Sequence, residues 1–490
     1  MKFLIIILIL FSSFNSFAEI SEKFNFDEMN LTDSSPLKVL STKGAPEVPA
    51  KSFVVSSENR ELSQYEIKKS WVKLKNNRNW TVSKGQKCRC KDEVRSEEVF
   101  TDQFSAENNV SYLGDFRGKH LFKVTVPLVK IEGKDQYFLE NFDFKAKKLD
   151  LFSRENIDFK TRKMVIVLPE EFDSAKTLIK KYYGSKFHSV DFVNDNRVIN
   201  DRRLLSGYLK DLYRESEVSH VLFVGNSNYV PTYYVDTKFD SVTPSDYPYF
   251  VMGGEKDLVP DIISSRWSVS SVEQIEGFLY KIEHRRKTNS PISLGVSSNE
   301  GHNPSDREYV SSILGSISND QNSVHLNQND SESNSNTFLG LLNNGVDFFN
   351  YIGHGSGFSW PSFGKEVFVS ELDNWLPSNT NPIVVDVACQ NGKFNGRGYI
   401  GEKMILGHQK FDFKNGAAAY IGGSVDISWD PPAIFAQGIS KSIKMNPSVE
   451  IGEAMFAGFF HLIELHHDID DLVDHLEWTH LQGDPTASIR

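Results

Sequence analysis

The chain has 490 residues with a formal net charge of -11 at pH 7, and 39% of its residues are hydrophobic and 12% aromatic. This length and apolar content exclude a disordered or fibrous protein and predict two or three domains with cores of their own. Because the chain has no surplus of basic residues to neutralise phosphate groups, we expect neither nucleic acid nor an anionic membrane surface as a partner.

The N-terminus has the pattern of an export signal. Met1-Lys2 supplies a positive charge, Phe3–Phe11 an apolar core, and Ser16-Phe17-Ala18 a cleavage site with small residues at both ends. We therefore expect residues 1–18 to be a signal peptide and the mature chain to begin at Glu19. No later apolar stretch approaches the roughly 20 residues that span a bilayer, so we predict no integral membrane segment and an exported protein, periplasmic or extracellular.

Residues 19–160 have the pattern of a β-rich module. Stretches such as Leu121–Val126 and Tyr137–Leu139 are strand-like, and helical periodicity is missing. The module ends in a polar, basic connector of the kind that proteases cut. The basic residues of this connector are Arg154, Lys160, Arg162 and Lys163.

In residues 161–490, short apolar runs alternate with amphipathic segments. The runs expected to be buried strands are Met164–Leu168, Val221–Val224, Phe348–Ile352, Ile383–Val385 and Ala417–Ile421. Helical spacing lies between them, for example in Leu204–Tyr213. This alternation predicts an α/β fold in which a layered parallel sheet is flanked by helices and joined by right-handed crossovers.

Two of the predicted strands end at a reactive side chain beside glycine. Tyr351–Gly357 reads YIGHGSG, and Val384–Gly392 reads VVDVACQNG. His354 and Cys389 lie 35 residues apart (389 − 354), which leaves room for one crossover and a return to the adjacent strand. A thiol needs a base or an imidazolium nearby to be a useful nucleophile at neutral pH. We therefore predict a Cys389–His354 pair, with the amides of Gly355 and Cys389 forming an oxyanion hole.

The remaining cysteines and a histidine pair give weaker signals. The chain has 3 cysteines, so at least one is unpaired within the chain. Cys88-Arg89-Cys90 lies in a polar, Lys-rich loop, which leaves a surface feature, a strained bridge and a weak metal contact open. His466-His467 stands beside aspartates but lacks the His-Glu-x-x-His spacing, and we expect a solvated acidic helix end and no zinc site there.

Several tracts resemble the gingipain family of cysteine endopeptidases, which have a caspase-like fold. Ala417–Trp429 (AAAYIGGSVDISW) is similar to the strand and loop that build the family's primary specificity pocket, and Ser245-Asp246-Tyr247 resembles another element of that pocket. Leu481–Pro485 resembles the end of the peptidase domain, and Tyr112–Gly118 is similar to a motif of the inhibitory propeptide. The resemblance implies a β-rich propeptide domain over residues 19–160 and a caspase-like peptidase domain over residues 161–490.

The resemblance also implies roles for the catalytic residues. Cys389 would be the nucleophile, and His354 the base or imidazolium partner that protonates the leaving amine. Glu300, in Ser298-Asn299-Glu300-Gly301, occupies a place similar to that of an orienting acid. A solvated loop carboxylate is the alternative for Glu300.

Specificity for basic residues is implied by the same comparison. Asp246 and Asp430 are candidates for the carboxylate that pairs with a basic substrate side chain, and Trp429 would stack along that side chain. If cleavage follows Arg or Lys, the basic residues of the connector are sites where the enzyme could remove its own propeptide.

We therefore predict a secreted cysteine endopeptidase, made as a zymogen, that cleaves protein or peptide substrates after Arg or Lys through a thioester acyl-enzyme. Its own propeptide would act as an inhibitor. A transpeptidase or sortase-like acyl transfer on the same fold and a non-catalytic binding protein remain as alternatives. No cofactor is expected to be required, although similar proteases hold calcium as a structural ion.

Overall fold

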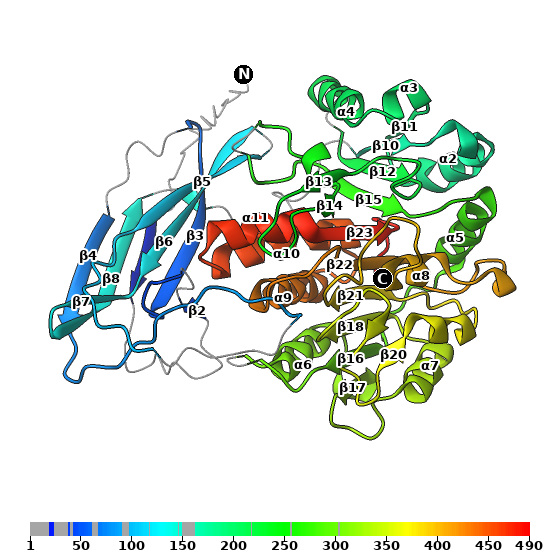
Figure 1. Ribbon diagram of the computed structural model, residues 1–490. Helices are drawn as coiled ribbons and strands as arrows, with labels where there is room; N and C mark the ends of the chain where they lie inside the picture. The colour runs from blue at the N-terminus through cyan, green and yellow to red at the C-terminus, as the bar shows by residue number, and fades with distance from the viewer. Residues whose placement is uncertain are drawn as a thin grey trace, which may run out of the picture.

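The structure is a computed structural model. It describes residues 19–23, 38–39, 43–60, 67–90, 98–116, 118–145, 147–148, 162–216, 218–254, 257–301 and 304–490. Figure 1 shows a β-rich body built from the first part of the chain, here called the N-terminal module (described residues from 19 to 148), beside a larger body with a central sheet.

The N-terminal module consists mainly of two antiparallel sheets. One contains β1 (Glu19–Lys23), β8 (Asp135–Lys145), β4 (Ile67–Lys73) and β7 (Val129–Glu132). The other contains β2 (Lys38–Val39), β3 (Pro49–Ser57), β6 (Lys119–Pro127), β5 (Asn109–Phe116) and β9 (Lys147–Lys148). Apolar side chains of both sheets share one core, in which the rings of Phe53 and Phe142 stack with centroids 5.8 Å apart. The expected β-rich character of this segment is therefore observed.

The larger body is organised around a 10-stranded sheet. From one edge to the other its strands are β11 (Ser189–Val193), β10 (Lys163–Val167), β12 (His220–Val224), β15 (Ile263–Trp267), β23 (Thr479–Gly483), β22 (Ala419–Gly423), β21 (Ile383–Val387), β18 (Phe348–Ile352), β16 (Ser293–Ser297) and β17 (Ser323–Asn327). Every ladder is parallel except the one between β22 and β23. The predicted α/β class is confirmed, and the long apolar runs are explained by burial of the strands on both faces.

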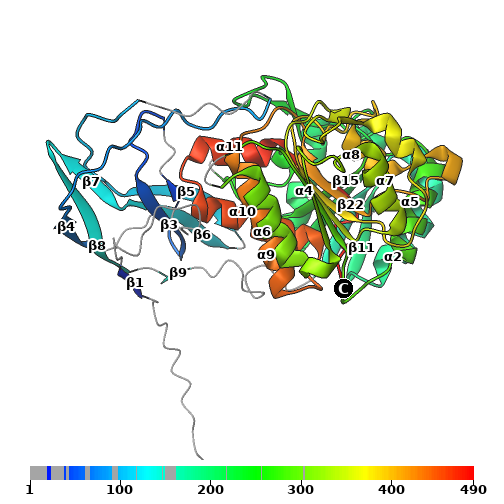
Figure 2. The ribbon, with the colours of Figure 1, turned by 90° about the horizontal axis from the view of Figure 1, so that it is seen from below.

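Helices cover both faces of this sheet. They are α2 (Lys176–Gly184), α3 (Asn196–Ile199), α4 (Arg202–Ser216), α5 (Val272–His284), α6 (Asp306–Ile317), α7 (Ser335–Asn344), α8 (Ile400–Leu406), α9 (Asp430–Met445), α10 (Ile451–Leu465) and α11 (Ile469–Trp478). Figure 2 shows α6, α9, α10 and α11 between the sheet and the N-terminal module, with α5, α7 and α8 on the opposite face. Two short hairpins complete the body: β13 (Tyr233–Val235) with β14 (Thr243–Ser245), and β19 (Ser359–Trp360) with β20 (Val367–Phe368).

The N-terminal module packs on α10 and on the turn that follows it. The ring of Phe116 lies 5.4 Å from that of Phe460, centroid to centroid, and the ammonium of Lys123 donates to the carbonyl of His466. His467 Nδ1 lies 2.9 Å from the hydroxyl of Ser52. The expectation of a solvated helix end at His466-His467 is therefore wrong, because both side chains are buried by this contact.

The signal peptide predicted for residues 1–18 and the boundary between residues 160 and 161 lie outside the described residues, as do Arg154 and Lys160, and these expectations stay predictions. Among the described residues, no helix combines the length and the apolar character needed to cross a membrane.

Candidate active site

The loops that carry His354 and Cys389 follow neighbouring strands of the sheet. β18 and β21 are paired in parallel, with Ile352 opposite Val387, so the two loops leave the same edge of the sheet together. A Cβ atom added to Gly355 would lie 2.4 Å from the carbonyl oxygen of Cys389, closer than a real side chain allows. Glycine at position 355 therefore lets the histidine loop lie directly on the backbone of the nucleophile.

Cys389 is the free cysteine of the described chain, and its side chain is buried. The next residue, Gln390, has φ 63°, which turns the backbone sharply at the end of β21. The amide of Ile427 points toward the Cys389 sulfur at 3.5 Å. Burial raises the pKa of the thiol to about 12, so the thiol is neutral while the site is covered.

An asparagine joins the two loops. Asn391 accepts a hydrogen bond from the backbone N–H of Gly357 at 2.9 Å and donates one from Nδ2 to Asp386 at 3.1 Å. The Asp386 carboxylate is fully enclosed and also accepts from Trp360 Nε1 (2.9 Å) and the Tyr420 hydroxyl (2.7 Å). Burial raises the pKa of Asp386 to about 6. This network fixes the histidine loop relative to the nucleophile loop.

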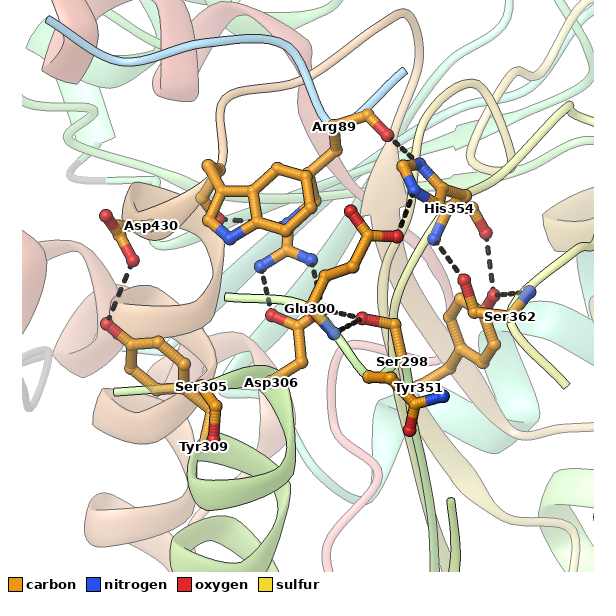
Figure 3. Close-up of polar contacts among 12 residues, drawn as sticks. Arg89, Ser298, Glu300, Ser305, Asp306, Tyr309, Tyr351, His354, Ser362 and Asp430 are labelled. Carbon is orange, nitrogen blue, oxygen red and sulfur yellow. Dashed lines mark hydrogen bonds and ion pairs between the residues drawn. The ribbon is translucent and has the colours of Figure 1, made fainter. Parts of the chain in front are cut away.

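Glu300 reaches the imidazole from a third strand end. It follows β16, whose Ser297 is opposite Ile352, and its Oε1 lies 2.8 Å from His354 Nε2 (Figure 3). The other ring nitrogen, Nδ1, donates to the backbone carbonyl of Arg89. The hydrogen bond with Glu300 raises the pKa of His354, and an imidazolium satisfies both acceptors at once. Glu300 thus lies where an orienting acid would, and not in a solvated loop.

A pocket beside the nucleophile is filled by Arg89 of the N-terminal module. The guanidinium is fully buried and donates from Nη1 and Nη2 to the two oxygens of Asp306, at 2.8 and 2.9 Å (Figure 3). It donates from Nε to the carbonyl of Trp429 at 2.9 Å and lies 4.6 Å from the centroid of the Trp429 ring. Asp306, the first residue of α6, is held in turn by the hydroxyl of Ser298 at 2.6 Å. We call this site, formed by Asp306 and Trp429, the Arg89 pocket.

The main chain around Arg89 runs along the pocket wall as a short antiparallel segment. The N–H of Arg89 donates to the carbonyl of Ile427 at 2.8 Å, and Cys88 forms a β-bridge with Ser428. The Arg89 carbonyl faces His354. The segment therefore lies across the site as a bound peptide would, with its arginine in the pocket.

The structure changes the prediction for two aspartates. The carboxylate of Asp246 is buried in a bidentate ion pair with Arg266, with both contacts at 2.8 Å, and does not enter the Arg89 pocket. Asp430 begins α9 and lies 3.4 Å from the hydroxyl of Tyr309, at the margin of the pocket. Trp429 lies where the stacking side chain was expected.

Asp306 was missed in the sequence. Its signal was the capping box at Ser305 and Glu308, which marks the start of a helix there but does not indicate that the intervening carboxylate points into a pocket. The sequence places Arg89 in a polar loop, but in the structure its side chain is buried and its charge is paired with Asp306. Of the alternatives for Cys88 and Cys90, the structure contains the bridge.

The two predicted processing residues inside the described chain are part of the folded body. Arg162 pairs with Glu450, and Lys163 is the first residue of β10 and lies 2.9 Å from Asp191. Cleavage after Lys163 would require unpairing of the strand that follows it.

A buried thiol, an imidazole held by a carboxylate, and a pocket beside them on a caspase-like sheet define the class of cysteine-type peptidases. Residues 157–490 match the model of Peptidase family C25, and the chain belongs to this family.

Curated relatives include Gingipain R2 of Porphyromonas gingivalis, 24% identical over 363 residues that cover 66% of this chain and 47% of the relative. Gingipain R1 of the same organism is 24% identical over 350 residues, 64% of this chain and 33% of the relative. The chain thus spans about half or less of the length of these relatives.

Two solved structures have a similar fold. The complex of the pro- and mature domains of P. gingivalis RgpB has a TM-score of 0.59 and 19% identity, covering 67% of this chain and 80% of the other. The Arg-specific cysteine proteinase gingipain R (RgpB) has a TM-score of 0.58 and 21% identity, covering 68% and 80%.

Proposed function

We propose that this protein is an endopeptidase that cleaves after arginine and is made as a zymogen in which the N-terminal module occupies its own active site. The observation that carries the proposal is the burial of Arg89 beside Cys389 and His354, paired with Asp306. An arginine supplied by the chain itself occupies the place of the substrate side chain. One protein of similar structure, gingipain R (RgpB), is an Arg-specific cysteine proteinase, which supports the same specificity here.

The contacts of the Arg89 pocket favour arginine over lysine. Asp306 offers its two oxygens to the two terminal nitrogens of a guanidinium, while the Trp429 carbonyl accepts from Nε and the ring lies over the charged plane. A planar guanidinium can satisfy all of these acceptors at once, whereas a lysine ammonium is a single point charge that cannot. We therefore narrow the predicted Arg or Lys specificity to arginine.

The proposed reaction uses the residues described above. The Cys389 thiol transfers its proton to His354, and the thiolate adds to the carbonyl carbon that follows the substrate arginine. The amides of Gly355 and Cys389 would stabilise the negative oxygen, and His354 would protonate the departing amine to leave a thioester. Water then attacks the thioester with His354 as the base. Glu300 holds the imidazole in orientation and favours its charged form.

Latency follows from occupation of the site. Arg89 blocks the pocket, and the burial that raises the pKa of the Cys389 thiol keeps it unreactive. Removal of the N-terminal module would expose both. Because Arg162 and Lys163 belong to the folded body and the proposed specificity is for arginine, we propose that self-processing uses Arg154 of the connector rather than Lys160. Export to the periplasm or beyond is part of the same proposal and rests on the signal pattern of residues 1–18.

The test uses the full chain beside Cys389→Ala and Asp306→Asn, with peptide-amide reporters that carry Arg, Lys, Asp or Asn before the scissile bond. Turnover of the Arg reporter by the wild type after its own processing, and none by Cys389→Ala, is expected. Turnover that needs an added amine acceptor would replace hydrolysis by acyl transfer. The absence of any Cys389-dependent product would leave a non-catalytic binding protein.

The same assay run with and without a chelator tests the expectation that no cofactor is required. Among the described residues, the cluster of His, Cys, Asp or Glu donors that could hold an ion is Cys88, Cys90 and Asp426, and its sulfur atoms do not suit calcium. Calcium as a structural ion therefore stays a prediction.

A further inference from the structure

The arginine that fills the pocket lies inside a very small disulfide loop. Cys88 and Cys90 are joined by a disulfide with only Arg89 between them. The bond that Cys389 would cleave, between Arg89 and Cys90, is therefore part of a covalent ring. Arg89 is buried, whereas Cys90 is exposed, so a small molecule in solvent can reach the Cys90 side of the bridge.

The ring binds like a substrate on one side of Arg89 and differently on the other. The Arg89 N–H donates to Ile427 in an antiparallel segment, and the side chain fills the pocket. The Arg89 carbonyl, in contrast, accepts from His354 Nδ1. For attack by Cys389, the carbonyl oxygen should lie at the predicted oxyanion hole, the amides of Gly355 and Cys389. The contact with His354 instead holds the Arg89 oxygen at the imidazole, which disfavours attack.

The ring also changes the outcome of any attack that does occur. If Cys389 cleaved the Arg89–Cys90 bond, the new amine of Cys90 would remain tied to Cys88 through the disulfide. A tethered amine stays at high effective concentration beside the thioester and re-forms the peptide bond in competition with water. In an open chain the amine would diffuse away. An intact disulfide would therefore favour Arg89 as an inhibitor, and loss of the disulfide would let the same residue act as a substrate.

We propose that the Cys88–Cys90 disulfide is a redox modification site, with a small thiol or dithiol as its reactant, and that its reduction converts the N-terminal module from an inhibitor into a substrate cut after Arg89. This inference rests on the proposed arginine-specific peptidase. A thiolate attacks the exposed Cys90 sulfur and Cys88 leaves as a thiolate; a second thiol resolves the mixed disulfide. Two thiols of the reactant are oxidised to one disulfide, and Cys88 and Cys90 are each reduced to a thiol.

The experiment compares the full wild-type chain before and after reduction. One sample is kept oxidised; the other is reduced in the presence of a chelator and then freed of reductant without air. The chelator matters because the sulfurs of Cys88 and Cys90, bridged in this structure, lie within 4.8 Å of a carboxylate oxygen of Asp426, and the thiols released by reduction could bind a metal ion there. Both samples are assayed in one buffer with the Arg reporter, and intact mass follows cleavage and the state of Cys389.

We expect the oxidised chain that is not yet processed in the connector to stay latent. Its Arg89–Cys90 bond should be either intact or hydrolysed with the gain of one water, and no fragment that ends at Arg89 should separate. The reduced chain should release a fragment that ends at Arg89 and gain about a hundredfold in activity, as expected when a tethered group becomes free. The double variant Cys88→Ser with Cys90→Ser should be active without reduction and change little when reduced. Equal alkylation of Cys389 after each sample has been denatured shows that the catalytic thiol is intact in all of them, and so excludes its recovery as the cause.

The proposal is overturned if the double variant is as latent as the oxidised wild type, or if the reduced wild type is not cut after Arg89. If circular dichroism shows that the double variant fails to fold, the comparison of oxidised and reduced wild type is used alone, and the absence of a cut after Arg89 in the reduced sample overturns the proposal. Brief trypsin treatment distinguishes failure of the redox proposal from failure of the proposed peptidase function. A trypsin-treated chain that is active, while reduction has no effect, removes this inference alone; one that is inactive on every Arg reporter removes the proposed function with it.

Discussion

Replacement of Asp306 by Asn tests the Arg89 pocket most sharply among single substitutions. The side chain keeps its shape, but it loses its charge and presents an N–H₂ group to one of the two guanidinium nitrogens now held at 2.8 and 2.9 Å. Both partners of this ion pair are completely buried, so the guanidinium of a bound arginine would lose its counter-charge in a desolvated site.

Breaking a buried ion pair by removal of one partner costs about 3–5 kcal/mol. Since about 1.4 kcal/mol corresponds to a factor of ten in rate, Asp306→Asn should lower kcat/KM for an Arg reporter by about 10²–10⁴-fold. The assay is initial-rate kinetics on chain whose N-terminal module has been removed. Reporters with a neutral residue before the bond should lose far less, because they do not need the charge.

Asp430→Asn serves as the matched control. Asp430 is also a carboxylate at a helix start near the pocket, but its oxygens lie 3.4 Å from the Tyr309 hydroxyl and 3.4 Å from Gln86 Nε2, and the guanidinium is paired with Asp306. We expect less than about a threefold change in kcat/KM, in line with a charge that acts from outside the pocket. A small effect of Asp306→Asn together with a large effect of Asp430→Asn would refute the assignment.

Three further substitutions have distinct expected outcomes. Glu300→Gln removes the main cause of the raised His354 pKa, so the imidazolium loses its proton at lower pH. The alkaline limb of the kcat/KM profile should therefore move to lower pH, and an unmoved limb would contradict a role for the Glu300–His354 contact. Asn391→Ala should lower kcat about tenfold or more with KM nearly unchanged, since it separates the two catalytic loops without touching the pocket; an increase in KM alone would count against this role. Asp246→Asn should lower the urea midpoint of unfolding, because breaking the buried pair with Arg266 costs about 3–5 kcal/mol. The preference for Arg over Lys reporters should be retained, and a changed preference would show that Asp246 contributes to the specificity pocket.

The parts of the fold that could be predicted from the sequence are those in which burial and local pattern agree. The strands β10, β12, β18, β21 and β22 are runs of apolar residues, and they were found for that reason. β15 (ISSRW) and β23 (THLQG) were missed, because polar side chains are buried there with partners supplied by distant segments. Gln482 of β23, for example, donates from Nε2 to the carbonyl of Gly392 at 2.9 Å and so holds the loop that follows Cys389.

In the candidate active site, too, residues in local motifs could be predicted, and residues that depend on long-range contacts could not. His354 and Cys389 follow adjacent strands within recognisable motifs, so the placing of their two loops at one edge of the sheet could be predicted from chain order alone. The contact between Arg89 and Asp306 joins residues 217 positions apart on separate bodies of the molecule, and no local pattern encodes it. Asp246 is a reasonable sequence candidate for the specificity pocket, because Ser245-Asp246-Tyr247 resembles an element of that pocket. The distant partner Arg266, whose charge its carboxylate neutralises, is not indicated by that local motif.

The central claim is that Arg89 of the N-terminal module closes an arginine-specific active site. Its most direct test is the rate at which a peptidyl-arginine electrophile alkylates Cys389 in unprocessed full-length chain, followed by intact mass, in the wild type and in Arg89→Ala. We predict that alkylation is at least about a hundredfold faster in Arg89→Ala, because a buried ion pair no longer competes for the pocket, and that a matching aspartyl electrophile reacts little. Equal slow alkylation of both proteins, or equal reaction with both electrophiles, would contradict it.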